Sequence, residues 1–160
     1  MDSERKESEQ LQKTTVPFLP KTRDWYFLDL KNKIAGRVAT KVAAILRGKN
    51  RSDFLPNLDL GDYVVLTNAK FVSFTGKKLT NEYYYNNSGH PGGMRQRSLK
   101  TMMDNYPTEL MKRIIKGMMP HTKLSEKQLK RLFIYSDSSH SHQAQEKNFI
   151  EISLEKTHKG

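Results

Sequence analysis

Short apolar runs and one helical stripe dominate the pattern in the first half of the chain. The runs at residues 25–30 and 63–68 are rich in aromatic and β-branched side chains, which predicts buried strands. Between them, apolar residues recur at helical spacing through residues 34–45, basic side chains fall on another face, and Gly48 follows as a stop signal. A strand, a helix and a strand in this order favour a right-handed parallel crossover.

The middle of the chain mixes strand and loop signals. Residues 71–75 predict a short strand that Gly76 ends. Residues 83–93 join three tyrosines to a loop with three glycines and a proline. Because glycine and proline break regular structure, this tract predicts an irregular, exposed connection.

Helical patterns return in the last third of the chain. Residues 98–105 predict one helix, and the segment after Pro107 predicts a stronger one, which Thr108 is expected to cap. Residues 124–131 are a further basic helical candidate. Residues 132–135 are typical of a last short strand, which a polar tail rich in serine and histidine follows.

The amount and the distribution of charge indicate a candidate function. The 160 residues include 28 lysines and arginines against 17 aspartates and glutamates, a net charge of +11, so the surface should attract polyanions. Residues 31–51 hold seven basic residues and no acidic one, and residues 95–131 hold ten basic against three acidic. A chain of this length supports one domain with a core. We therefore expect one nucleic-acid-binding domain with tails.

Several kinds of chemistry lack the residues that they need. The Gly-Lys pairs at Gly48 and Gly76 do not make a phosphate loop, because Ala43 and Phe71 stand where its first glycine is required. The chain has no cysteine, and its histidines lack a regularly spaced carboxylate partner, so we expect neither a metal nor a cofactor. No catalytic cluster stands out, and no apolar run reaches the roughly 20 residues of a membrane-spanning helix. We expect no enzyme, no small-molecule substrate and no membrane contact.

Residues 83–97 are a candidate for direct nucleic-acid contact. They combine three tyrosines, three glycines, one histidine and two arginines, which could stack on bases, approach a backbone closely and pair with phosphates. A solvated loop with some tyrosines packed inward is the alternative. The turn at residues 47–51 is either a solvated basic turn or a phosphate clamp, and the planar fork of arginine favours the clamp.

Seven sequence blocks follow one another without large gaps over roughly residues 22–143. They are Asp24-Trp-Tyr-Phe-Leu-Asp29, Ala35-Gly-Arg-Val-Ala-Thr40, Leu46-Arg-Gly-Lys49, Gly61-Asp-Tyr-Val-Val65, Phe74-Thr-Gly-Lys-Lys78, Ser88-Gly-His-Pro-Gly-Gly93 and Lys116-Gly-Met-Met-Pro120. Together they resemble the L-thirteen family of large-subunit ribosomal proteins. The resemblance implies an α/β fold with three α/β/α layers around a four-stranded, mainly parallel sheet, plus extended tails.

The resemblance also implies a function and a set of contacts. Members of this family bind large-subunit rRNA during assembly and remain as a scaffold beside neighbouring large-subunit proteins. A free RNA-binding regulator outside the ribosome is the alternative. The side chains expected to bind RNA are Arg37, Arg47, Lys49, Arg51, Lys77, Lys78, Tyr85, His90, Arg95, Arg97, Lys112 and Lys116.

The ends of the chain bear on domain boundaries and origin. We expect a flexible extension at residues 1–21, an rRNA-binding domain at 22–143 and a C-terminal tail at 144–160. The extension resembles mitochondrial members of the family, as does the replacement of the glycine-rich continuation that bacterial members carry after Pro120. We therefore expect a mitochondrial ribosome, with a plastid or a bacterial cytoplasm as alternatives.

Overall fold

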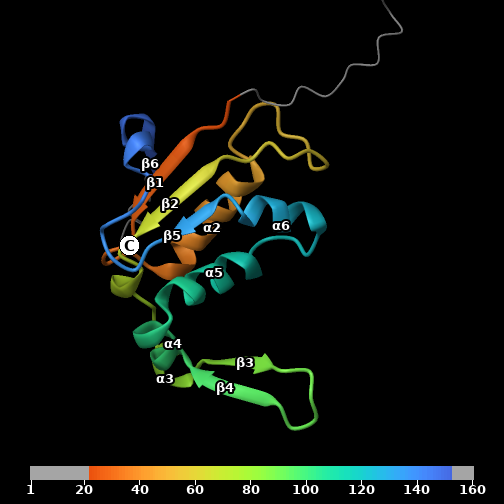
Figure 1. The fold of residues 1–160 in the computed structure, drawn as a ribbon, viewed down its shortest axis with the longest axis vertical. Coiled ribbons are helices and arrows are strands. Elements are labelled where there is room, and N and C mark those ends of the chain that lie inside the picture. The colour runs from red at the N-terminus through yellow and green to blue at the C-terminus, as the bar shows by residue number, and fades with distance from the viewer. Residues whose placement is uncertain (1–21, 153–160) are drawn as a thin grey trace, which may run out of the picture.

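A four-stranded parallel sheet forms the centre of the protein. The computed structural model describes residues 22–152, and Figure 1 shows the strands side by side. Their order is β5-β2-β1-β6, made of β1 (Trp25–Asp29), β2 (Tyr63–Thr67), β5 (Leu132–Ile134) and β6 (Phe149–Glu151). Every pairing in this sheet is parallel. The prediction of an α/β fold with a four-stranded parallel sheet is confirmed.

Three α-helices cover one face of this sheet. They are α2 (Ala35–Arg47), α5 (Pro107–Gly117) and α6 (Lys123–Leu129). Helix α2 forms where the apolar stripe predicts it. Gly48 ends it in the left-handed conformation with a φ of 78°, which glycine adopts without a steric penalty.

The main core lies between the helices and the sheet. Leu28, Leu66 and Leu132 alternate along their strands onto the helical face and are buried there. Met111 and Ile115 of α5 are fully buried in the same cluster. Truncation of one such side chain to alanine typically costs about 2–5 kcal/mol, so this packing dominates the stability of the sheet domain.

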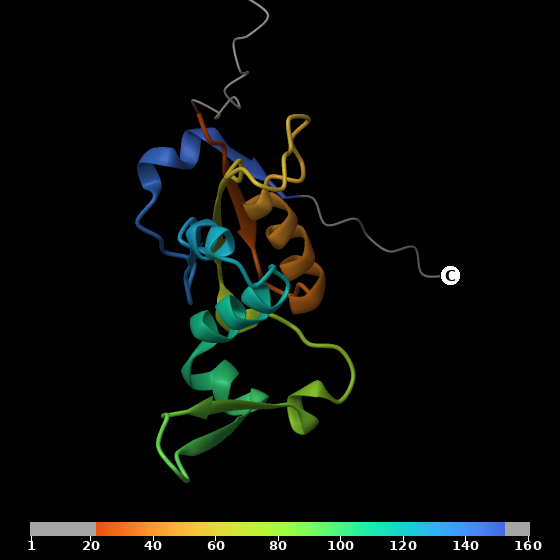
Figure 2. The ribbon, with the colours of Figure 1, turned by 90° about the vertical axis from the view of Figure 1, so that its right-hand side faces the viewer.

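Aromatic side chains line the opposite face of the sheet. Trp25 stacks on Tyr63 with 4.4 Å between ring centroids, and Phe27 stacks on Phe149 at 5.3 Å. The segment that leads into the 3-10 helix η2 (Gln143–Asn148) lays its histidines on these rings. Figure 2 shows η2 and α2 on opposite sides of the sheet. The three layers thus have α-helices on one side and a 3-10 segment on the other.

A smaller region projects below the sheet domain in Figures 1 and 2. It consists of α3 (Lys78–Asn81), the antiparallel strands β3 (Tyr83–Asn87) and β4 (Met94–Ser98), and α4 (Leu99–Asn105). We call β3, β4 and their connecting turn, residues 83–98, the hairpin.

Two predictions for the middle of the chain are wrong. Residues 83–93 are not an irregular connection, because they form β3 and the turn of the hairpin. Strand β4 carries polar side chains on both faces, so its sequence lacks the apolar alternation that predicts a strand. Residues 71–75 form no strand beyond a single bridge between Ser73 and Ile34. The chain instead enters this segment through the 3-10 helix η1 (Ala69–Phe71).

Two predictions nearer the C-terminus also need correction. Thr108 does not cap α5, because the helix begins one residue earlier, with Tyr106 as N-cap and Pro107 as the first helical residue. Proline suits that position because its missing N–H would have no partner there. Residues 132–135 do not contain the last strand, since β6 follows and pairs with β1. The segment that we expected to be a tail thus supplies an edge strand, too short to be recognised from its pattern.

Residues 1–21 and 153–160 lie outside the described part of the chain, and so do the predicted extension and the end of the predicted tail. Within residues 22–152, every helix is too short or too polar to cross a membrane.

Candidate nucleic-acid interface

The hairpin presents two chemically different faces. Its register places Tyr84 opposite Arg97, and residues directly opposite in an antiparallel pair share a face. The register therefore sorts the ten paired side chains into two sets, and Asn87 and Ser98, at the strand ends, belong to the second. The first, which we call the arginine face, carries Tyr84, Asn86, Arg95 and Arg97. The second, which we call the tyrosine face, carries Tyr83, Tyr85, Met94 and Gln96.

The arginine face holds the hairpin against the helices. The Arg113 guanidinium lies 5.5 Å from the centroid of the Tyr84 ring and donates a hydrogen bond to Asn86 Oδ1. The Arg97 guanidinium lies 4.9 Å from the centroid of the Tyr106 ring. Each such cation–π contact contributes about 0.5–2 kcal/mol, depending on burial. Sequence reasoning missed Arg113, because its partners on the hairpin are far away along the chain.

A second, small core lies beneath the hairpin. Leu99, Met102 and Leu110 are fully buried in it, and Tyr84 packs against them. Burial raises the pKa of the Tyr84 hydroxyl, the nearby charge of Glu82 adds to this, and the charge of Arg113 opposes it. Tyr84 is therefore a neutral anchor, in contrast to its two neighbours in the sequence.

The tyrosine face is open to solvent. Tyr83, Tyr85 and Met94 are 46%, 56% and 66% exposed. Exposed aromatic rings on a strand form a platform on which bases can stack, and each stacked base typically contributes about 1–3 kcal/mol. Tyr85 belongs to the predicted contacts, whereas Tyr83 was not singled out. The hairpin therefore brings Tyr85, Arg95 and Arg97 close together but places the ring and the two guanidinium groups on different faces.

Glycines shape the turn of the hairpin. Gly89 and Gly92 have φ values of 84° and 70°, which favour glycine. A Cβ on Gly93 would lie 2.0 Å from Ser88 Oγ, which would have to rotate away, and 3.0 Å from the His90 carbonyl oxygen. The turn leaves His90 exposed between the two strands.

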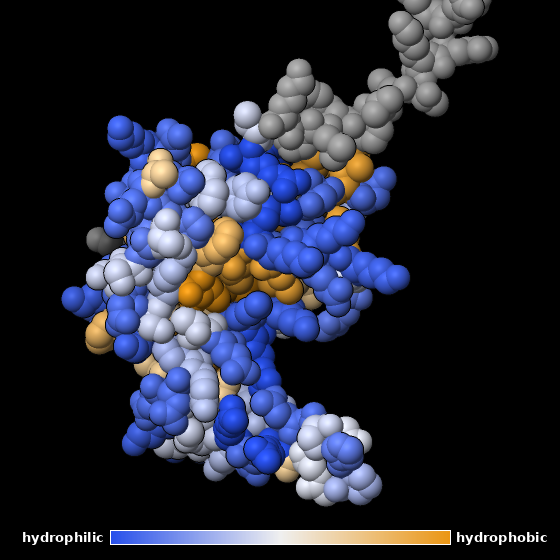
Figure 3. Space-filling model, viewed as in Figure 1, coloured by the Kyte–Doolittle hydropathy of each residue, from blue (hydrophilic) through white to orange (hydrophobic). Residues whose placement is uncertain are grey.

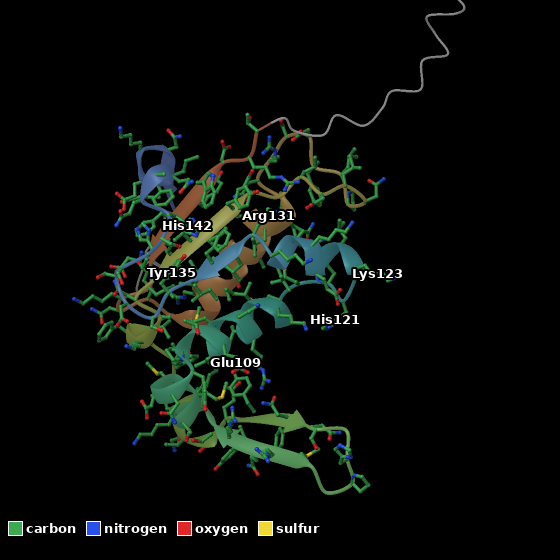
Figure 4. All side chains as sticks on the ribbon, viewed as in Figure 1. Glu109, His121, Lys123, Arg131, Tyr135 and His142 are labelled. Carbon is green, nitrogen blue, oxygen red and sulfur yellow. The ribbon has the colours of Figure 1, made fainter. Side chains whose placement is uncertain are left out.

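A second cationic surface surrounds the turn between α5 and α6. Three hollows adjoin one another there. Arg47 and Lys49 line the first, Arg47 and Pro120 line the second, and Pro120 and Lys123 line the third. The cationic and histidine side chains along them, which we call the turn surface, are Arg47, Lys49, Lys116, His121 and Lys123. One acidic side chain, Glu126, also lines the third hollow. Figure 4 shows Lys123 and His121 at the outer edge of the molecule.

Sequence reasoning found three members of the turn surface and missed two. His121 and Lys123 lie in the segment that departs from the bacterial family pattern, so nothing carried a contact onto them. The Thr122 hydroxyl accepts a hydrogen bond from the Ser125 N–H at 3.3 Å and caps α6. The turn before this cap places Pro120 and Thr122 in one hollow with Arg47 at the end of α2.

Arg51 has a structural role that competes with RNA binding. Its Nη1 contacts Asp62 Oδ1 at 2.9 Å, and its Nε contacts Asp53 at 3.5 Å. Burial raises the pKa of Asp62, although a hydrogen bond from the Asp24 N–H and the charge of Arg51 oppose the rise. Arg51 thus compensates a carboxylate that is only 2% exposed. Its contact with RNA stays a prediction that this ion pair must compete with.

The loop between α2 and β2 is held by a second ion pair and by a close backbone approach. Arg131, only 6% exposed, donates a hydrogen bond to Asp59 Oδ2 at 2.8 Å, and Arg23 contacts the same oxygen at 3.4 Å. A Cβ on Gly61 would lie 1.8 Å from the Leu46 carbonyl oxygen. The acidic side chains of this loop therefore serve the fold.

The remaining predicted contacts lie away from the turn surface. Arg37 is exposed in the first turn of α2, and Lys77 and Lys78 are exposed at the start of α3, near the base of the hairpin. Lys112 lines a groove between α5 and β5, together with Glu109. The structure thus gathers some of the predicted cations on two surfaces and leaves others dispersed.

The histidines near β6 belong to the aromatic face of the sheet. His142 lies 4.4 Å from the Phe133 ring, between centroids. Burial lowers the pKa of His142, and the neighbouring His140 lowers it further, so the neutral imidazole is favoured. Across residues 22–152, no three histidine, cysteine or acidic side chains are placed so that they could hold a metal ion.

The sequence of this chain is similar to that of a known protein family. Residues 23–141 match the family described as Ribosomal protein L13. A relative from Citrifermentans bemidjiense, named large ribosomal subunit protein uL13, is 45% identical over 131 residues, which cover 82% of this chain and 92% of the relative.

Two relatives of the same name show comparable similarity. The one from Ureaplasma urealyticum is 46% identical over 132 residues, which cover 82% of this chain and 89% of the relative. The one from Geobacillus thermodenitrificans is 44% identical over 130 residues, which cover 81% and 90%. The family match spans strands β1, β2 and β5 of the sheet, the hairpin and the turn surface. The chain therefore belongs to the ribosomal protein L13 family.

Proposed function

We propose that this chain is a structural constituent of the large ribosomal subunit and binds rRNA through the hairpin and the turn surface. The names of its relatives support the assignment to that subunit. The observation that carries RNA binding is the separation of charge. Asp59 and Asp62 are engaged by arginines inside the sheet domain, whereas Arg95 of the hairpin and the lysines of the turn surface are exposed. The outward charge fits a polyanion.

The two surfaces would contribute to affinity in different ways. Lysines and arginines that neutralise phosphates release counterions, so their contribution falls as salt rises. If about six cations contact phosphates, the logarithm of the affinity should fall with the logarithm of the salt concentration with a slope of roughly −4 to −5. Stacking of bases on Tyr83 and Tyr85 would add a contribution to the affinity that hardly depends on the salt concentration.

A charge-reversal experiment tests the turn surface. Arg47→Glu combined with Lys49→Glu should weaken binding to purified large-subunit rRNA and flatten the salt slope by about two units. Lys147→Glu is the matched control, because Lys147 is exposed on η2, on the opposite side of the sheet from α2. A slope that Arg47→Glu and Lys49→Glu leave unchanged would remove the turn surface from the interface.

Sedimentation separates a ribosomal role from a free regulator. The tagged chain should migrate with the large subunit at moderate salt, and rRNA should be found in the same fractions. The family membership supports this structural, non-enzymatic role and gives no support to the regulator. A light peak without rRNA would contradict the proposal.

The location within the cell is a separate part of the proposal. The N-terminal segment and residues 121–131 favour a mitochondrial ribosome, whereas the relatives described above are bacterial and fit a bacterial cytoplasm equally well. Sedimentation of lysates from whole cells and from purified organelles distinguishes these alternatives.

We also propose a longer RNA-binding domain than the one at residues 22–143. Strand β6 pairs with β1 at residues 149–151, and Ile152 is buried in the main core. A chain cut after residue 143 should therefore lose stability, because it exposes one edge of β1 and part of the aromatic face. Thermal unfolding of the cut and uncut chains measures this loss.

A further inference from the structure

Strand β5 is an edge of the sheet, and one side of it has no partner strand. It pairs with β2 alone, and the Tyr135 N–H donates to the Leu66 carbonyl at 2.8 Å on that side. Backbone groups of alternate residues point to opposite sides of a strand, so those of Leu132 and Ile134 point away from β2. Among residues 22–152, no backbone group forms a hydrogen bond with the outward N–H and carbonyl groups of Leu132 and Ile134.

A groove runs along this open side, between β5 and α5. It has a volume of about 470 Å³, and its lining joins the whole of β5 to side chains of α5. The residues that line it are Thr108, Glu109, Lys112, Leu132, Phe133, Ile134 and Tyr135. Figure 3 shows apolar surface over β5, surrounded by hydrophilic side chains, and Figure 4 shows Glu109 and Tyr135 on the same face of the molecule.

We infer that this groove docks an extended segment of another large-subunit protein, which adds to β5 as a fifth strand. The inference rests on the proposed function, because it takes the partner from the assembled subunit. An extended peptide supplies what the edge lacks, since its N–H and carbonyl groups alternate at the spacing of the outward groups of Leu132 and Ile134.

The charges of the groove favour a peptide over RNA. The Glu109 carboxylate, about half exposed, lies 3.8 Å from the Arg113 guanidinium, so its charge is partly compensated. Within the lining, one lysine, Lys112, accompanies one glutamate, so the groove lacks the excess of cations that binds a polyanion. This is unlike the turn surface, where five cationic or histidine side chains accompany one acidic one.

The groove also defines the kind of segment that fits. Alternate apolar side chains of the segment would rest on the apolar surface of β5 and its neighbours. Proline is disfavoured at positions that donate to Leu132 or Ile134, because it has no N–H. Lys112 then becomes part of a protein contact, which explains its position away from the turn surface.

The first test locates what occupies the groove in the assembled particle. The substitution Thr108→p-benzoylphenylalanine places a photoreactive group in the groove of the full chain, away from the turn surface. Large subunits that contain this chain are purified and irradiated, and the cross-linked product is identified by mass spectrometry. We expect an adduct with a peptide of another large-subunit protein. An adduct with rRNA, an adduct with a second copy of this chain, or no adduct would overturn the inference.

A matched pair of variants tests the strand pairing itself. Ile134→Pro removes an outward N–H but leaves the hydrogen bonds to β2 in place, whereas Ile134→Val keeps the N–H. The yield of the cross-link should fall at least about tenfold with proline and stay unchanged with valine. Equal yields from the two variants would contradict strand addition.

Hydrogen exchange on the unsubstituted chain gives a result that does not depend on how Ile134→Pro folds. The Ile134 amide should exchange at least about tenfold more slowly in the large subunit than in the isolated protein. An unchanged rate would overturn the inference. A chain that fails to sediment with the large subunit contradicts the proposed function, whereas a chain that sediments with it but yields no peptide adduct contradicts the groove alone.

Discussion

The sheet domain and the hairpin use the same residue types for different purposes. In the sheet domain, Arg51 and Arg131 contact aspartates inside the protein, and Tyr63 stacks on Trp25. In the hairpin, Arg95 is exposed and Tyr85 is 56% exposed. The difference lies in the surroundings, because acids and aromatic rings accompany the first set and not the second. An arginine or tyrosine is a stronger candidate for RNA contact where the fold leaves its side chain exposed to solvent.

The two regions also differ in how they are held. A large core of leucine, valine and isoleucine supports the sheet domain, whereas the hairpin depends on a three-residue buried cluster and two cation–π contacts. Substitutions in the sheet domain should therefore act on stability, and substitutions on the tyrosine face should act on binding.

Among the substitutions that test this comparison, Gly61→Ala in the sheet domain should have the largest effect, a loss of stability. Its Cβ would lie 1.8 Å from the Leu46 carbonyl oxygen, and backbone atoms cannot rotate away as a side chain can. We expect the free energy of unfolding to fall by about 3–5 kcal/mol in urea titrations. Gly36→Ala is the matched control, since a Cβ there meets nothing within 4 Å and alanine favours the helix. Equal stability of the two variants would contradict the close approach.

A smaller loss should follow from Asp59→Ala. The change leaves the Arg131 guanidinium, 6% exposed, without its carboxylate partner, which should cost about 3 kcal/mol in thermal unfolding. Glu109→Ala breaks the more exposed pair with Arg113 and should cost less than about 1 kcal/mol. If both changes had the same small effect, the arginines of the sheet domain would not be structural.

Tyr85→Ala tests the other half of the comparison. Loss of a stacking platform should weaken binding to large-subunit rRNA by about 1–3 kcal/mol and leave the salt slope unchanged, because no charge is removed. The melting temperature should not change, since the ring is exposed. Phe71→Ala removes a ring of similar exposure outside the hairpin and should leave affinity unchanged. Equal losses of affinity would show that the hairpin has no special role.

The smallest expected effect concerns the aromatic face of the sheet. Burial, and then the neighbouring His140, lower the pKa of His142 from its ordinary value of 6.5. The unfolded chain therefore binds a proton at a higher pH than the folded one. The free energy of unfolding should fall as the pH drops below 6.5 and level off below the folded pKa. His142→Phe should reduce this dependence, measured by urea unfolding across that range, whereas His90→Phe at the exposed turn should not.

The sheet domain was the more predictable region because its patterns are strong. Strands β1 and β2 are unbroken apolar runs, and α2 repeats its apolar residues over three turns, so their positions agree with the prediction within about two residues. Strand β4 could not be recognised, because neither of its faces is apolar. Strand β6 has three residues, and its pairing with β1 depends on a contact across most of the chain.

The candidate site was predictable as a composition and not as a geometry. The sequence places Arg47 and Arg51 in one basic turn, but only the fold brings Asp62 to Arg51 and leaves Arg47 on the surface. Likewise, the fold brings the turn between α5 and α6 to the end of α2, where Pro120 and Thr122 share a hollow with Arg47. Sequence spacing contains no signal for either event.

The separation along the chain between paired strands sets an order of events during folding. Trp25 and Phe149 are 124 positions apart, whereas six residues separate the paired ends Asn87 and Met94 of the hairpin. The entropy cost of closing a loop rises with its length, and hairpins close in roughly microseconds. The hairpin can therefore form while the sheet still lacks its edge strand. If the hairpin binds rRNA as proposed, a nascent chain would engage rRNA before the sheet is complete.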